Sequence, residues 1–181
     1  MPNLSYETAL IVGAGSGLSA SLARLFAREG LRVALAARNT EKLAPLCAET
    51  GARAFACNAV EPDQVTRLFS DVDAAVGSPD VVVYNASARA RGPLVELVPD
   101  EVERAIMVSA FAGFLVAREA AAHMLPKGRG AIRTPDRVEA PDRPDSMLDP
   151  DAIAASYLHM LRQPRSAWNW EVELRPWVER F

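Results

Sequence analysis

A short apolar run that stops at a cluster of glycines most constrains the fold of this chain. Ala9–Val12 is followed by Gly13, Gly15 and Gly17, and then by apolar residues at helical spacing. This order predicts a buried strand, a tight turn and a helix that begins directly after the turn. Such an arrangement directs unpaired backbone N–H groups and the positive end of the helix toward an anion.

The glycine spacing fits two interpretations. In one, the turn binds the pyrophosphate of a dinucleotide, because a larger side chain there would keep the phosphates out of reach of the backbone N–H groups. The residues of that predicted site are Gly13, Gly15, Ser16, Gly17 and Leu18. In the other interpretation, this is an ordinary glycine-rich turn between a strand and a helix.

The end of the second predicted strand bears on the kind of dinucleotide. In NAD-binding folds, an acidic residue about 20 residues after the glycines binds the ribose 2′-hydroxyl. Here the strand Arg32–Ala37 ends without a carboxylate, and Arg38 follows it. A guanidinium without a competing carboxylate suits a 2′-phosphate, so we expect NADP(H) to be preferred over NAD(H). The alternative is that Arg38 is a solvated arginine at a strand end.

Composition excludes several other classes of function. The chain has 181 residues, of which 50% are hydrophobic and 24% charged, as expected of one globular domain. A net charge of −3 gives no electrostatic reason to expect nucleic-acid binding. The apolar runs look too short to span a bilayer, no signal pattern is visible, and Cys47 and Cys57 lack metal-ligand spacing. We therefore expect a cytoplasmic protein with no metal, nucleic-acid or membrane partner.

Strand and helix patterns alternate along the first part of the chain. Further strands are expected at 52–57 and 80–84, and a long helix is expected from Asp100, as its N-cap, to about Met124. This alternation predicts an α/β fold with a parallel sheet. Asn85, Ala86 and Ser87 follow the strand at 80–84, at the sheet edge where ligands bind in such folds. Asn85 is therefore either a cofactor contact or a turn residue.

These features together resemble the first half of a short-chain dehydrogenase/reductase, over residues 8 to about 132. The resemblance rests on four sequence patterns and one helix: the Gly13–Gly17 turn, Ala37-Arg38-Asn39, Cys57-Asn58, Asn85-Ala86-Ser87 and the helix Val102–Met124. It implies a Rossmann-like, doubly wound parallel sheet. It also implies that Asn58 and Ala59 bind the cofactor together with Asn85, Ala86 and Ser87.

The end of the chain resembles the last helix and strand of the same family. A helix is predicted from Asp149-Pro150-Asp151 to Leu161, and a half-buried strand at Trp168–Leu174. We therefore expect one Rossmann-like domain over 1–181. Its parts are a dinucleotide-binding half at 1–132, a proline-rich charged loop at 133–149, and a C-terminal helix and strand at 150–181.

The catalytic pair of the family is missing. Its members use a tyrosine with a lysine four residues later, but none of Tyr6, Tyr84 and Tyr157 is followed by a lysine at that spacing. The position of the family's helical asparagine is held by Ser109. We therefore assign no catalytic residue.

The sequence places this loss at one junction. Gly130–Ile132 resembles the start of the family's fifth strand, and Arg133–Pro135 resembles the loop after its sixth. The resemblance implies an internal deletion, natural or artificial, or a lineage of shortened proteins. The deletion would truncate the sheet and leave the strand at 80–84 without a neighbour. We expect either the strand at 168–174 or a second subunit to cover it. We also expect homo-oligomers to form through the helix at 101–124.

The sequence is compatible with three functions. The first is NADP(H)-dependent carbonyl reduction or alcohol oxidation, by resemblance to the family, with impaired catalysis and an unknown substrate. The second is a non-catalytic protein that binds a dinucleotide or a partner chain. The third is a nonfunctional remnant that folds poorly.

Overall fold

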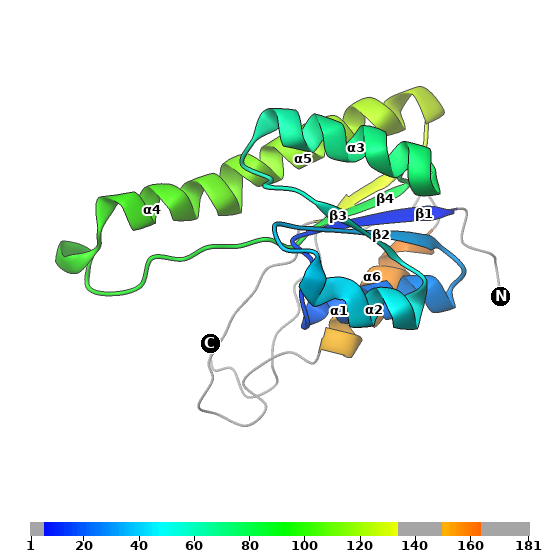
Figure 1. The fold of residues 1–181 in the computed structure, drawn as a ribbon, viewed down its shortest axis with the longest axis horizontal. Coiled ribbons are helices and arrows are strands. Elements are labelled where there is room, and N and C mark those ends of the chain that lie inside the picture. Colours follow the sequence, from blue (N-terminus) through cyan, green and yellow to red (C-terminus); the bar gives the residue numbers. More distant parts are fainter. Residues whose placement is uncertain (1–5, 134–149, 164–181) are drawn as a thin grey trace.

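A five-stranded parallel sheet forms the centre of the structure, a computed structural model that describes residues 6–133 and 150–163 (Figure 1). The strand order is β3-β2-β1-β4-β5. The strands are β1 (Thr8–Val12), β2 (Arg32–Ala37), β3 (Arg53–Ala56), β4 (Val81–Tyr84) and β5 (Ala131–Arg133). The predicted Rossmann-like α/β fold is confirmed.

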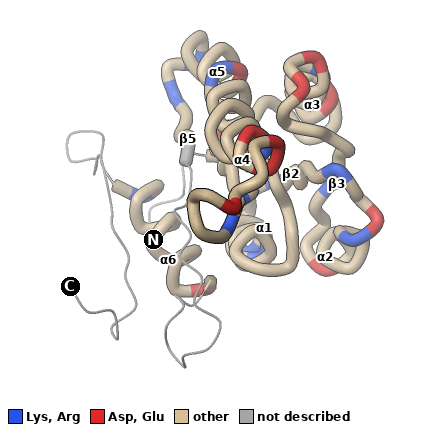
Figure 2. Tube along the Cα trace, turned by 90° about the vertical axis from the view of Figure 1, so that its left-hand side faces the viewer, with Lys and Arg blue, Asp and Glu red and all other residues tan. Residues whose placement is uncertain are grey.

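Helices cover both faces of the sheet. They are α1 (Leu18–Arg28), α2 (Ala44–Thr50), α3 (Pro62–Val76), α4 (Pro99–Ile106), α5 (Ala112–Met124) and α6 (Pro150–Leu161). Helices α1, α2 and α6 lie on one face, and α3 and α5 lie on the other (Figure 2). Helix α6 packs beside α1, and an ion pair between Arg162 and Glu29 joins their ends.

The central strands are buried on both faces, as their continuous apolar sequences predict. Ile11 and Val83 point into the core beneath α1 and α6, whereas Leu10 and Val82 point into the core beneath α3 and α5. The apolar residues of α3 that were expected to face inward are all buried. The helical spacing of these apolar residues matches their burial, because only one face of each helix packs against the sheet.

The long helix begins two residues earlier than predicted. Its N-cap is Val98, and Pro99 occupies the first helical position, so the assignment of Asp100 as N-cap is wrong. A proline at this position has no N–H to leave unpaired, and its fixed φ already suits the helix. Asp100 instead lies in the first turn, where its carboxylate faces the positive helix end.

The helical path continues from α4 through a π turn, Met107–Phe111, into α5 and ends at Lys127. These 29 residues are long and apolar enough, by length and composition alone, to cross a bilayer. The expectation that every apolar run is too short for this was therefore wrong. In the structure, the α5 half packs on the sheet through buried residues, among them Ala112, Leu115 and Val116.

Strand β4 has a neighbour within the chain. Ala131 to Arg133 pair in parallel register with Val81 to Val83, and the Ala131 N–H donates to the Asp80 carbonyl at 2.8 Å. The prediction that the fourth strand lacks a neighbour is therefore wrong, because three residues of β5 suffice to cover it. The predicted loop 133–149 is wrong at its first residue, because Arg133 belongs to β5. The rest of that loop and the predicted strand Trp168–Leu174 lie outside the described residues.

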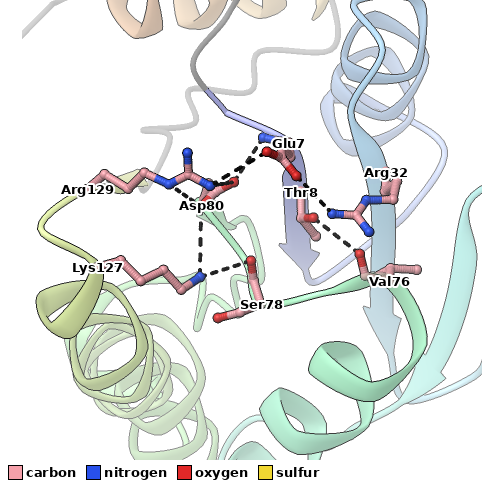
Figure 3. A network of polar contacts seen from close by, with 8 residues as sticks. All are labelled: Glu7, Thr8, Arg32, Val76, Ser78, Asp80, Lys127 and Arg129. Carbon is pink, nitrogen blue, oxygen red and sulfur yellow. Dashed lines mark hydrogen bonds and ion pairs between the residues drawn. The ribbon is translucent and has the colours of Figure 1, made fainter.

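A buried carboxylate connects the amino ends of β1 and β4 to the segment that leads into β5 (Figure 3). Asp80 is 1% exposed, and its Oδ2 accepts the backbone N–H of Glu7 at 2.9 Å. Its Oδ1 lies 3.2 Å from Nε of Arg129 and 3.8 Å from Nζ of Lys127. Because both cations immediately precede β5, the carboxylate holds that strand against β4.

We expect Asp80→Ala to lower the free energy of unfolding by about 1–3 kcal/mol, because the Glu7 N–H loses its acceptor and the cations lose their partner. Urea denaturation measures this change. The matched control is Glu7→Ala, which removes an exposed ion pair with Arg32 and a long one, 4.0 Å, with Arg129, and should cost less than about 1 kcal/mol. Equal losses in the two variants would contradict the role given to Asp80.

Candidate functional site

A cleft of about 390 Å³ opens at the carboxyl ends of the strands. Its walls come from the ends of β1, β2, β3 and β4 and from the α4 side of the molecule. The lining residues are Val12, Gly13, Ala14, Ala37, Arg38, Asn39, Lys42, Cys57, Asn58, Ala59, Val60, Tyr84, Asn85, Ala86, Ser87, Ala88, Arg104 and Val108. This edge of a parallel sheet is the usual place for a ligand in open α/β folds.

The first turn passes against the end of β4 with no room for a side chain. Gly13 has φ +83°, and a Cβ built on it would lie 2.3 Å from the backbone N of Ala86. The Gly13 N–H also donates to the Ala36 carbonyl at 2.9 Å. Both the conformation and the close approach therefore require glycine here.

A relay of hydrogen bonds holds this turn in place. The Asn85 side-chain N–H donates to Ser19 Oγ at 2.6 Å, and the Ser19 hydroxyl donates to the Gly13 carbonyl at 3.2 Å. The Asn85 backbone N–H donates to the Val12 carbonyl at 2.8 Å. Asn85 thus lines the cleft and also braces the glycine turn.

Seven of the eleven residues predicted to bind a cofactor line this cleft. They are Gly13, Arg38, Asn58, Ala59, Asn85, Ala86 and Ser87.

The other four lie outside the lining, at the start of α1. The side chain of Leu18 is buried in the core, whereas Gly15 and Ser16 are exposed. Gly17 is the N-cap of α1, with no side-chain capping bond and no acidic residue in the first turn. The first backbone N–H groups of α1 are therefore suited to an anion.

Cations line the cleft on more than one side. Arg38 follows β2, Lys42 lies in the short helix Glu41–Leu43, and Arg104 lies in α4. No carboxylate belongs to the lining. Sequence reasoning missed Lys42 and Arg104, because neither follows a strand directly and no local pattern marks them.

The tyrosine in the cleft wall has a structural partner. Tyr84 is 3% exposed, and its hydroxyl donates to the Val108 carbonyl in the π turn. Burial, with a smaller effect of Cys57, raises the pKa of Tyr84 to about 12. Burial also raises the pKa of the Cys57 thiol. Tyr84 is therefore a protonated hydrogen-bond donor at neutral pH, already occupied by a backbone acceptor.

Ser109 fastens the π turn to the loop that follows β4. Its Oγ donates to the Ala88 carbonyl at 2.9 Å and accepts the Ala88 N–H at 3.1 Å. Ser109 does not itself line the cleft. Among the described residues, no three His, Cys, Asp or Glu side chains are grouped as a metal ion would require.

Comparison with known proteins identifies related sequences. The family model described as short chain dehydrogenase matches residues 7–133. Gluconate 5-dehydrogenase of Gluconobacter oxydans is 31% identical over 137 residues, which are 72% of this chain and 53% of that protein. D-threitol dehydrogenase of Mycolicibacterium smegmatis is 30% identical over 134 residues, which are 71% and 52% of the two chains. The chain spans about half the length of these curated relatives.

Solved structures match over a larger share. A short-chain dehydrogenase from Rhodopseudomonas palustris superposes with a TM-score of 0.81 and 28% identity, covering 94% of this chain and 99% of the other. A metagenomic short-chain oxidoreductase in complex with NADP superposes with a TM-score of 0.85 and 25% identity, covering 98% and 100%.

Two glycine substitutions separate folding from ligand binding at the turn. We expect Gly13→Ala to lower the free energy of unfolding by roughly 2–4 kcal/mol, through its positive φ and the clash with Ala86. Gly15→Ala should leave stability within about 0.5 kcal/mol, because a Cβ there has no neighbour within 4 Å. It should weaken dinucleotide binding, since the methyl group occupies space beside the N–H groups. Thermal unfolding and calorimetric titration measure the two effects, and a strongly destabilised Gly15→Ala would contradict this division.

Proposed function

Because the chain belongs to the short-chain dehydrogenase family, we propose that it binds NADP(H) in preference to NAD(H) in the cleft at the carboxyl edge of its sheet. The observation that carries this proposal is Arg38 in a cleft lining that contains two further cations and no carboxylate. A 2′-phosphate is a dianion, and a guanidinium can bind it through two parallel hydrogen bonds.

The site fits a dinucleotide in shape as well as in charge. At Gly15 no protein atom lies within 4 Å of the position a Cβ would take, so a ligand can approach the backbone of the turn. The amino end of α1 has no side-chain cap and no acidic residue in its first turn. Ala37 leaves no carboxylate where one would repel a 2′-phosphate. A solved relative that holds NADP on the same fold supports the assignment.

Arg38→Ala should weaken NADP⁺ binding about 10- to 100-fold and leave NAD⁺ binding nearly unchanged, since it removes a charged hydrogen-bond donor to the phosphate. Tryptophan fluorescence titration with each cofactor gives the ratio of the two dissociation constants. The control is Arg67→Ala, an exposed arginine of α3 outside the cleft lining. A ratio that is the same in Arg38→Ala as in the unchanged chain would count against the assignment.

We further propose that family chemistry, carbonyl reduction or alcohol oxidation, is impaired in this chain. When bound, the cofactor would supply the hydride for reduction or accept it in oxidation, and a residue of the protein would have to donate the proton in reduction or accept it in oxidation. Tyr84 is engaged with the Val108 carbonyl, and Tyr157 is buried in α6 within the core on the α1 side. Neither tyrosine has a lysine four residues later.

An internal deletion at the Ile132–Arg133 junction accounts for this loss. Residues before the junction follow the family pattern as far as β5, which pairs with β4. Helix α6, which comes after the junction in the sequence, packs beside α1. The superpositions on solved short-chain dehydrogenases support the family fold for this chain.

The purified chain should turn over carbonyl and alcohol substrates at least about 100-fold more slowly than a family member that has the tyrosine–lysine pair, because general acid catalysis is missing. Nicotinamide absorbance measures the rates over a substrate panel. Turnover equal to that of the other enzyme would contradict the proposal. If that turnover disappeared in Tyr157→Phe but persisted in Tyr84→Phe, Tyr157 would be the proton donor.

A second function, non-catalytic association, is favoured by the uncovered apolar face of the long helix. Phe114 is 57% exposed and Ile106 58% exposed, and the Phe111 and Phe114 rings stack with centroids 6.4 Å apart. Large apolar side chains grouped at a surface mark association sites. We propose that cytoplasmic homo-oligomers form through residues 101–124, with the bound dinucleotide as a ligand and not as a reactant.

A further inference from the structure

The cations of the cleft stand on opposite walls. Arg38 and Lys42 lie where β2 leads toward α2, on the α1 side of the sheet. Arg104 and Val108 line the cleft from the long helix, which lies on the side of α3 and α5 (Figure 2). A ligand that fills the cleft is therefore contacted by cations at two different places.

The position of Arg104 is set by contacts of the helix that carries it. Arg104 lies four residues before Val108, so both share a helical face. The Val108 carbonyl accepts the Tyr84 hydroxyl, and Ser109 is bonded twice to Ala88. These contacts hold the helix against the end of β4, and they keep Arg104 at the cleft.

The Arg104 guanidinium has no protein partner among residues 6–133 and 150–163. Three carboxylates, Asp100, Glu101 and Glu103, lie close in sequence, but none pairs with it and none lines the cleft. The side chain is exposed. An unpaired guanidinium on a binding wall is available to a ligand.

The chemistry of the surrounding wall indicates which part of the ligand Arg104 meets. Asn58, Ala59, Val60 and Val108 line the cleft with uncharged and mostly apolar side chains. Such a wall suits a flat heteroaromatic base and not a phosphate. The 2′-phosphate is assigned to Arg38 on the opposite wall and the pyrophosphate to the glycine turn at the start of α1. The purine base is therefore the flat group of the adenosine half that remains for Arg104.

We propose that Arg104 stacks its guanidinium on the purine base of the bound dinucleotide and so adds to binding of the adenosine half. This inference rests on the proposed function of the same cleft. A planar guanidinium stacks on aromatic faces more effectively than an ammonium group does. The contact is independent of the 2′-phosphate, so Arg104 strengthens NADP(H) and NAD(H) binding equally.

The test is calorimetric titration of the full chain with NADP⁺, NAD⁺ and adenosine 2′,5′-bisphosphate. Arg104→Ala should weaken all three by the same factor, about three- to tenfold, and leave the ratio of NADP⁺ to NAD⁺ affinity unchanged. Arg104→Lys, which keeps the charge without the plane, should recover less than half of the lost affinity. The matched control is Arg118→Ala, which removes an exposed arginine of α5 outside the cleft lining.

Other outcomes separate this inference from the function on which it rests. If Arg104→Ala weakens binding of NADP⁺ and of the bisphosphate but not of NAD⁺, Arg104 binds the 2′-phosphate and the stacking role is wrong. If the variant binds all three ligands as tightly as the unchanged chain does, Arg104 has no role in binding while the proposed function stands. If the unchanged chain binds neither NADP⁺ nor NAD⁺, the proposed function is wrong, and this inference with it.

Discussion

The close contact between Gly13 and Ala86 is the constraint on which the rest of the site depends. A glycine with φ +83° lets the first turn lie directly on the backbone that leaves β4, although 73 residues separate the two in sequence. The Asn85–Ser19–Gly13 hydrogen bonds then lock that contact. Because the turn and the end of β4 are held together, α1 begins just beyond the cleft lining at Gly13 and Ala14, and its first N–H groups are suited to an anion.

The charged residues of the cleft favour binding of an anion, whereas the tyrosine in its wall is not placed to transfer a proton. Cations stand on both walls and no carboxylate lines them, so the cleft attracts an anionic ligand along its length. The tyrosine that lies in this wall, Tyr84, has its hydroxyl bound to a backbone carbonyl and a pKa raised to about 12. Its hydrogen bond serves the shape of the cleft, by holding the π turn against β4.

At the amino end of β4, Asp80 keeps the short strand β5 paired with β4. Asp80 accepts the Glu7 N–H, and its carbonyl accepts the Ala131 N–H. Its carboxylate also faces Arg129 and Lys127, which precede β5. A buried carboxylate is costly unless cations and N–H groups surround it, so this group selects the arrangement in which β5 lies on β4. The carboxyl end of β4 thus holds the first turn, and its amino end holds β5.

Local pattern was sufficient for much of this protein. Apolar runs bounded by glycine, and helical spacing as in Val65, Leu68, Phe69 and Val72, predicted the order of strands and helices, since burial against one sheet imposes those periods. The residues that end β2, β3 and β4 were predicted to meet at one edge, because parallel strands must bring their carboxyl ends together.

Tertiary structure alone decided what depends on partners distant in sequence. Three residues of β5 are too few for a periodic signal, so the sequence indicated this strand only through the family resemblance. Their place beside β4 follows from Asp80, about 50 positions earlier in the chain. Arg104 reaches the cleft only because Tyr84 and Ala88 hold its helix there. The need for glycine at position 13 likewise comes from Ala86. Sequence determines the elements through near neighbours, whereas the walls of the cleft form only when packing brings remote residues into contact.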